Sequence, residues 1–118
     1  MAFTFYGPSR HESLENYKVR VWLENGSGVG QTGLVATMTA WLGKADNTSA
    51  QILTAGGAER TVTEVDSTNL PGVYDFALTS GDLDTIGATT LWVDGGGSSE
   101  PVAYHFDVLA QDYYGGRP

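Results

Sequence analysis

The stretch that most constrains the fold of this chain is residues 71–87, PGVYDFALTSGDLDTIG. It opens with a Pro-Gly turn and then alternates, with large apolar side chains at every second position, which predicts a strand buried on one face. Thr79 stands where a short helical turn would be capped, and Asp82 completes a carboxylate form of the capping box. Gly87 can close the turn in a left-handed conformation. The stretch therefore predicts a corner at which the chain passes from one β-sheet to the next.

The side chains that repeat on one face of this corner are expected to fill the core. In the strand they alternate, and in the turn they have the i, i+3 spacing that shares one helical face. The predicted core residues are Tyr74, Phe76, Leu78, Leu83 and Ile86. Tyr74, early in its strand, also suggests the tyrosine corner of Greek-key sandwiches.

Short alternating segments recur along the rest of the chain, separated by glycine-rich or polar connections. No connection has room for a helix of about ten residues, which excludes parallel βαβ units. The pattern predicts an all-β fold, an Ig-like antiparallel β-sandwich of six to seven strands with a short N-terminal arm. The predicted strands are 17–24, 34–42, 51–54 (weak), 60–65, 73–78, 88–94 and 102–109, in a sandwich at 17–110 with an arm at 1–16 and a tail at 111–118.

The alternation also assigns an inner and an outer row to each predicted strand. The inner rows of the first two strands and of the last strand are Tyr17, Val19, Val21 and Leu23; Leu34, Ala36, Met38, Ala40 and Leu42; and Val102, Tyr104, Phe106 and Val108. The outer row of the first strand is Lys18, Arg20, Trp22 and Glu24.

Composition limits the classes of protein to which this chain can belong. Its 118 residues suffice for one domain that buries about two-thirds of its unfolded surface. The absence of cysteine excludes disulfides and thiolate metal sites, and the net charge of −8 argues against nucleic-acid binding. No apolar run approaches the roughly 18 residues of a membrane span, and the N-terminus lacks the pattern of a signal peptide. We therefore expect a soluble protein that is not secreted by a standard signal.

Catalytic and metal-binding patterns are weak. His11 and His105 stand beside no plausible nucleophile in sequence, and no G-x-S-x-G motif is present. Asp82 and Asp84 lie two residues apart, the one hint of a Ca²⁺ site, which needs about six to eight oxygen ligands. The favoured interpretation is that Asp82 caps a turn and Asp84 is solvated. We expect no enzyme activity, cofactor or metal.

The three tryptophans are the most informative candidates for a binding site. Trp22, Trp41 and Trp92 all fall opposite the aliphatic rows. Either they form an interaction surface, since tryptophan is enriched at hot spots, or a bulge shifts a register and returns some of them to the core. An exposed set would bind protein through an apolar patch with a polar rim, or sugar rings by stacking. Lys18 and Arg20 flank Trp22, which favours a partner with an acidic rim there.

Both ends of the chain are aromatic. Residues 1–16 contain Phe3, Phe5 and Tyr6, which is unlike a disordered tail, and we expect this arm to dock on its own domain or on a neighbour. Tyr113 and Tyr114 lie in the tail, and we expect both ends to be adhesive.

Several motifs together resemble a known family. These are QTGL at 31–34, TVTEV at 61–65, the G-x-Y-x-x-x-L-T-x-x-D block at 72–82 and D-T-x-G at 84–87. They resemble the small Ig-like modules of tailed-bacteriophage structural proteins over roughly residues 18–110, although the connection at 43–59 is longer than in those modules. The family has no shared catalytic or cofactor residues.

The resemblance implies a non-enzymatic virion protein, assembled in the host cytoplasm and present in several copies. Its implied role is head decoration, neck or tail adaptor, or fibre attachment, with capsid, neck or tail proteins as partners. No nucleic acid or membrane is expected as a partner. The alternative is a carbohydrate-binding surface module that uses exposed tryptophans.

Overall fold

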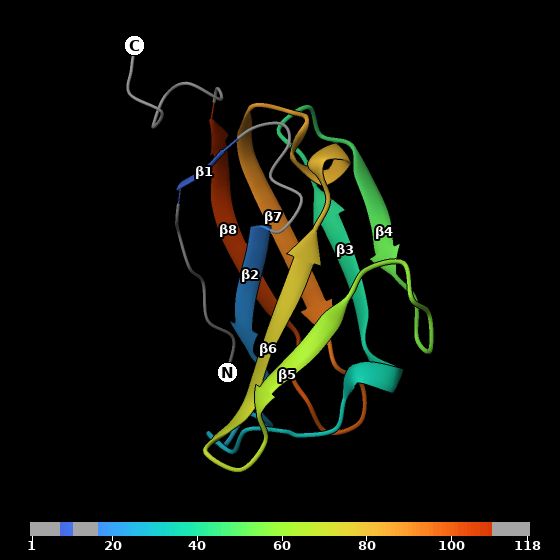
Figure 1. Ribbon diagram of the computed structural model, residues 1–118, viewed down its shortest axis with the longest axis vertical. Helices are drawn as coiled ribbons and strands as arrows, with labels where there is room; N and C mark the ends of the chain where they lie inside the picture. The colour runs from blue at the N-terminus through green and yellow to red at the C-terminus, as the bar shows by residue number, and fades with distance from the viewer. Residues whose placement is uncertain (1–7, 11–16, 110–118) are drawn as a thin grey trace.

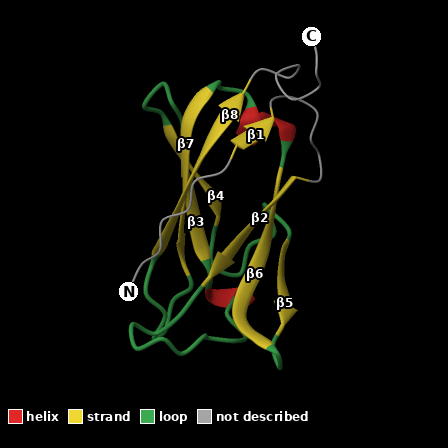
Figure 2. Cartoon of the chain, turned by 90° about the vertical axis from the view of Figure 1, so that its left-hand side faces the viewer, coloured by secondary structure: helices red, strands yellow, loops and turns green. Residues whose placement is uncertain are grey.

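The computed structural model describes residues 8–10 and 17–109, which form two β-sheets packed face to face (Figures 1 and 2). The smaller sheet has the order β2-β6-β5, and these strands are β2 (Tyr17–Trp22), β5 (Val62–Asp66) and β6 (Leu70–Leu78). The larger sheet has the order β1-β8-β7-β3-β4. Its strands are β1 (Pro8–Arg10), β3 (Thr39–Gly43), β4 (Ser49–Leu53), β7 (Gly87–Asp94) and β8 (Val102–Leu109).

The strand order is that of an immunoglobulin fold. The order β2-β6-β5 corresponds to strands B-E-D, and β8-β7-β3-β4 corresponds to the G-F-C sheet extended by one strand beyond C, as in variable-type domains. These seven strands pair antiparallel, whereas the short β1, inside the predicted arm, pairs parallel with β8. The chain is therefore an all-β, Ig-like sandwich, as predicted, and each of the seven predicted strands has a counterpart.

The core lies between the two sheets and includes most of the residues predicted for the corner. Tyr74, Phe76, Leu78 and Leu83 are fully buried. Ile86 is 58% exposed, so its assignment to the core was wrong. The predicted i, i+3 face requires a helical turn that reaches residue 86, but the 3₁₀ turn η2 (Ser80–Leu83) ends before it. Gly87 does adopt the predicted positive φ, at 124°.

Tyr74 uses its hydroxyl differently from a tyrosine corner. It lies in the middle of β6, where its hydroxyl donates to the carbonyl of Gln31 at 2.7 Å and accepts from the amide of Leu34 at 3.1 Å. A tyrosine corner bonds to main chain a few residues upstream, whereas Tyr74 fixes a connection some forty residues earlier. The buried hydroxyl thereby ties the long link between β2 and β3 to the smaller sheet.

The predicted strand at 34–42 is wrong in its first half. Residues Val35–Thr37 form the 3₁₀ turn η1, and Ala36, predicted to face inward, is exposed. The hydroxyl of Thr37 donates to the carbonyl of Gly95 at 2.6 Å, so side-chain bonding at this end replaces strand pairing. Only two short 3₁₀ turns are present in the described part of the chain, and neither has the length or apolarity to cross a membrane.

Glu24 is a further correction, because it was predicted to face outward and is 2% exposed. Strand β2 ends at Trp22, and Glu24 lies beyond it in an isolated antiparallel bridge with Gly30. Its Oε1 accepts from the amides of Gly26 and Gly28 at 2.8 and 3.0 Å, which orders the glycine-rich loop. Alternation ceases to predict the face of a residue where the strand ends.

Candidate interaction surface

Trp41 and Trp92 lie side by side on the outside of the larger sheet. They are direct cross-strand partners in the β3–β7 pairing. Their neighbours along each strand, Ala40, Leu42, Leu91 and Val93, are all buried. Period-2 alternation therefore turns both indoles outward, and Trp41 and Trp92 are 42% and 39% exposed. The β3–β4 pairing does shift its register between Ala40 and Trp41, but this shift leaves both indoles outward and returns neither to the core.

The surroundings of the pair form a broad outer surface. The row that contains the two tryptophans continues to Gln51 on β4 and Ala103 on β8. We call the outward positions of these strands the tryptophan face: Thr39, Trp41, Ser49, Gln51, Ala88, Thr90, Trp92, Asp94, Ala103, His105 and Asp107. Apart from the indoles these side chains are small or polar, which gives an aromatic centre with a polar rim.

A hollow adjoins one end of the tryptophan face. It encloses about 420 Å³ and is lined by Gly43, Lys44, Ala45, Asn47, Thr48, Ser49, Ala88 and Thr90. Gly43 occupies the position on β3 two residues beyond Trp41, and a Cβ added there would meet no atom within 4 Å. Because this position carries no side chain, the face is lowered next to the indoles.

Charges on the tryptophan face are carboxylates. Asp94 lies two residues from Trp92 on the same side of β7, and its Oδ1 accepts from the amide of Gly96 at 2.9 Å. Asp107 is exposed on β8, opposite Ala88. At the rim, Lys44 is bound to Asp84 at 2.7 Å and to the carbonyl of Gly81 at 2.9 Å.

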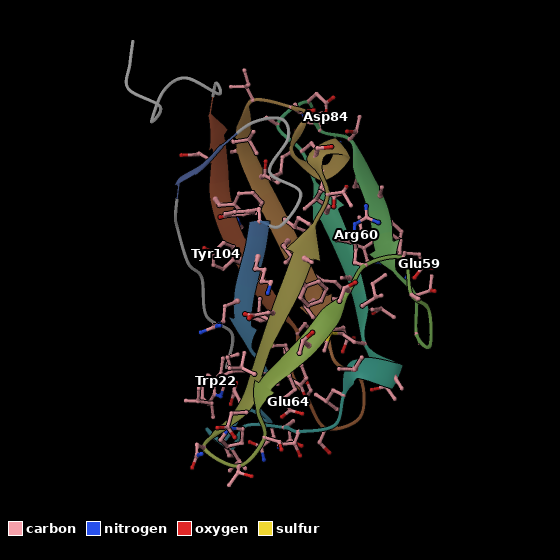
Figure 3. All side chains as sticks on the ribbon, in the orientation of Figure 1. Trp22, Glu59, Arg60, Glu64, Asp84 and Tyr104 are labelled. Carbon is pink, nitrogen blue, oxygen red and sulfur yellow. The ribbon has the colours of Figure 1, made fainter. Side chains whose placement is uncertain are left out.

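The third tryptophan, Trp22, lies on the opposite side of the sandwich, on the outer face of β2 (Figure 3). It is half-buried, and its Nε1 donates to the carbonyl of Pro71 at 3.2 Å. An apolar groove of about 320 Å³ runs beside it, lined by Arg20, Val21, Trp22 and Val73. The three predicted tryptophans therefore do not form one surface.

The two cations predicted to flank Trp22 differ in their surroundings. Lys18 is exposed, whereas Arg20 forms a bidentate pair with Asp75 at 2.7 and 2.9 Å. The hydrogen bonds from Arg20 hold the pKa of Asp75 below its usual range. Asp75 was not predicted as a partner, because alternation places it on the outer side of its strand but does not show that this strand pairs with the first one.

The remaining predicted contact residues, Phe3, Phe5, Tyr6, Tyr113 and Tyr114, lie outside the described residues.

The carboxylates that hinted at a metal site serve the corner instead. Asp82 completes the predicted capping box with Thr79 and also forms a bidentate pair with Arg60. Burial alone would raise the pKa of Asp82, but hydrogen bonds from Arg60 and from the Thr79 amide outweigh it and lower that pKa. Asp84, expected to be solvated, is 58% exposed yet paired with Lys44. Nowhere in the described part do three or more His, Asp or Glu side chains converge as metal ligands would.

His105 lies beside the hydroxyl group of Thr90, and this contact by itself does not form a catalytic arrangement. Its Nδ1 lies 2.8 Å from Oγ1 of Thr90, on the tryptophan face. A triad would require an activated nucleophile, an orienting carboxylate and donors for an oxyanion. His11 lies outside the described residues.

Comparisons with known proteins give matches to solved structures alone. No protein-family model matches the sequence, and no curated protein matches it. One similar structure is the second Ig domain of the mouse polymeric immunoglobulin receptor, with a TM-score of 0.48 and 13% identity over 92% of this chain and 98% of that domain. Another is the Ig-like domain of human leucine-rich repeat-containing protein 4, with a TM-score of 0.29 and 12% identity over 86% of this chain and 82% of that one. The Ig-like assignment rests on the strand order.

Proposed function

We propose that this chain is a non-enzymatic binding module of a tailed-phage virion, which contacts other virion proteins through the tryptophan face. The observation that carries the proposal is the Trp41–Trp92 pair, two adjacent indoles of which about two-fifths remains exposed. Tryptophan is among the residues most enriched at binding hot spots. An exposed aromatic centre with a polar rim is typical of a protein contact.

The virion setting comes from the motifs at 31–34, 61–65, 72–82 and 84–87, which resemble Ig-like modules of tailed-phage structural proteins. Because a fold does not by itself imply a function, the proposal depends on the tryptophan face and on this resemblance together. It includes head decoration, neck or tail adaptor and fibre attachment, with assembly in the host cytoplasm. Capsid, neck or tail proteins are the proposed partners, and the acidic net charge argues against nucleic acid.

The test is to add the purified protein back to particles assembled without it and to measure binding by co-sedimentation. We expect the double variant Trp41→Ala/Trp92→Ala to lose at least about 2 kcal/mol of binding free energy, roughly thirty-fold in affinity. Leu70→Ala is the matched control, since Leu70 is an apolar residue 47% exposed on the other sheet. Unchanged binding of the double variant, with its fold verified by thermal melting, would reject the tryptophan face.

Carbohydrate binding is the second candidate, and the hollow beside the indoles is the observation that favours it. Asn47, Thr48, Ser49 and Thr90 line the hollow with amide and hydroxyl groups, next to rings on which a sugar can stack. Titration with neutral cello-, malto- and chito-oligosaccharides, followed by tryptophan fluorescence, separates the two functions. Saturable binding that the double variant loses, without binding to particles, would favour the carbohydrate function.

A further inference from the structure

The tryptophan face carries negative charge. Asp94 and Asp107 project from it, and among its described side chains none belongs to lysine or arginine. Asp94 accepts a hydrogen bond at one carboxylate oxygen from the main-chain amide of Gly96, and none of the ion pairs in the described part of the chain involves Asp94 or Asp107. The two largest apolar side chains of the surface therefore share it with two carboxylates.

Most of the cations that the structure describes are engaged elsewhere. Lys44 is paired with Asp84, Arg60 with Asp82, and Arg20 with Asp75 on the opposite sheet. Lys18 lies on that opposite sheet as well. Arg10 lies on β1 beside Leu109 of β8, whereas Asp94 lies at the opposite end of the neighbouring strand β7. A cation beside Trp92 and Asp94 is therefore best supplied by the bound partner.

We infer that the protein bound by the tryptophan face presents arginine side chains at alternate positions of an extended segment. This inference rests on the proposed function and specifies its partner. A guanidinium group stacks on an indole ring by a cation–π contact and forms forked, charge-assisted hydrogen bonds to a carboxylate. Arginine fits both parts of the surface better than lysine, whose ammonium is compact and strongly hydrated.

The spacing along β7 supports an extended segment. Trp92 and Asp94 are two residues apart on one side of the strand, which corresponds to about 6.6–6.8 Å. Arginines at alternate positions of an extended segment repeat at the same distance. One guanidinium then lies over the indole of Trp92 while the next meets the carboxylate of Asp94.

The experiment uses the full chain and two synthetic peptides, acetyl-Gly-Ser-Arg-Ser-Arg-Ser-Gly-amide and the same peptide with citrulline, which is neutral and nearly isosteric, in place of arginine. Binding is followed by the indole N–H NMR signals, assigned with Trp22→Ala, Trp41→Ala and Trp92→Ala. We expect the signals of Trp41 and Trp92 to shift. The arginine peptide should bind about fivefold more tightly than the citrulline peptide at low salt, and the difference should shrink as salt rises.

Two charge variants test the carboxylates. Asp94→Asn/Asp107→Asn should reduce the preference for arginine to less than about twofold, because the charges are lost while an amide oxygen can still accept from Gly96. Asp66→Asn is the matched control, since it removes one charge at the β5–β6 turn and keeps an acceptor for the amides of Thr68 and Asn69. This control should keep the arginine preference.

Equal affinity for both peptides, shifts confined to Trp22, or an arginine preference that survives in Asp94→Asn/Asp107→Asn would each overturn the inference. These results leave the proposed function standing if Trp41→Ala/Trp92→Ala still loses particle binding. If that double variant binds particles normally, the proposed function fails, whatever the peptides show.

Discussion

The corner between β6 and β7 and the tryptophan face use their side chains in opposite ways. At the corner, Thr79, Asp82 and Arg60 satisfy one another, and Leu83 is fully buried beneath them (Figure 3 shows Arg60 below the turn). On the tryptophan face, Trp41 and Trp92 leave about two-fifths of their area in water. The polar groups of the corner bond to one another within the fold. The tryptophan face instead keeps exposed apolar area that a bound molecule can cover. The comparison predicts that changes at the corner cost stability and changes on the face cost binding.

The largest expected effect is on the core strand that leads into the corner. Phe76 is fully buried and pairs with Val19 on one side and Val62 on the other. Phe76→Ala should therefore lower the free energy of unfolding by about 3–5 kcal/mol in denaturant melts. Binding per folded molecule should not change. A loss below about 1 kcal/mol would contradict the account of the corner.

Arg60→Ala should have the next largest effect. It leaves the carboxylate of Asp82, 5% exposed, without its cation, which should cost about 3 kcal/mol of stability. Arg20→Ala is the matched control, because it breaks the same kind of bidentate pair with Arg20 60% exposed, where the cost should be at most about 1 kcal/mol. Equal losses of stability in the two variants would show that burial does not make the Arg60–Asp82 pair contribute more than the exposed Arg20–Asp75 pair.

Acid should weaken the corner in a way that depends on Arg60. The pKa of Asp82 is lowered in the folded state, so the unfolded chain takes up the proton first as pH falls. The stabilisation is complete above the unfolded pKa of about 4 and is lost as pH falls through the lower folded pKa. The free energy of unfolding is measured between pH 5 and pH 2 for the wild type and for Arg60→Ala. We expect it to fall less steeply with decreasing pH in Arg60→Ala. An identical slope in both proteins would place the acid-sensitive groups elsewhere.

The smallest stability effect is expected on the tryptophan face. Trp41→Ala and Trp92→Ala should each cost about 1 kcal/mol or less, since they remove a cross-strand pair at the surface. Trp22→Ala should cost more, because Trp22 is half-buried and bonded to Pro71. Thermal melts of the three variants rank these losses. Should Trp22→Ala leave stability intact and abolish particle binding, the contact would belong to the smaller sheet.

Alternation and turn chemistry predicted the sandwich because both are local. The capping box of Thr79 and Asp82 and the outward positions of Trp41 and Trp92 follow from neighbours in sequence. The predictions fail where a long-range contact, or the end of a strand or turn, decides the conformation or the exposure of a residue. Ile86 is exposed because η2 stops early, and residues Val35–Thr37 form a turn tied to Gly95.

The pairing of the two tryptophans could not be predicted from either strand alone. Trp41 and Trp92 meet because β3 and β7, far apart in sequence, are neighbours in the larger sheet. The same strand order places Trp22 on the opposite sheet. The ion pairs of Arg60 with Asp82 and of Arg20 with Asp75 likewise depend on contacts between distant segments.

Oxidative footprinting of the unmodified protein tests the central claim most directly. Tryptophan oxidation is measured by mass spectrometry for the free protein and for the protein bound to particles assembled without it. The account predicts that Trp41 and Trp92, exposed in the free protein, become protected on binding, and that oxidation of the half-buried Trp22 stays the same. Protection of Trp22 alone, or no protection of Trp41 and Trp92 in the bound fraction, would contradict it.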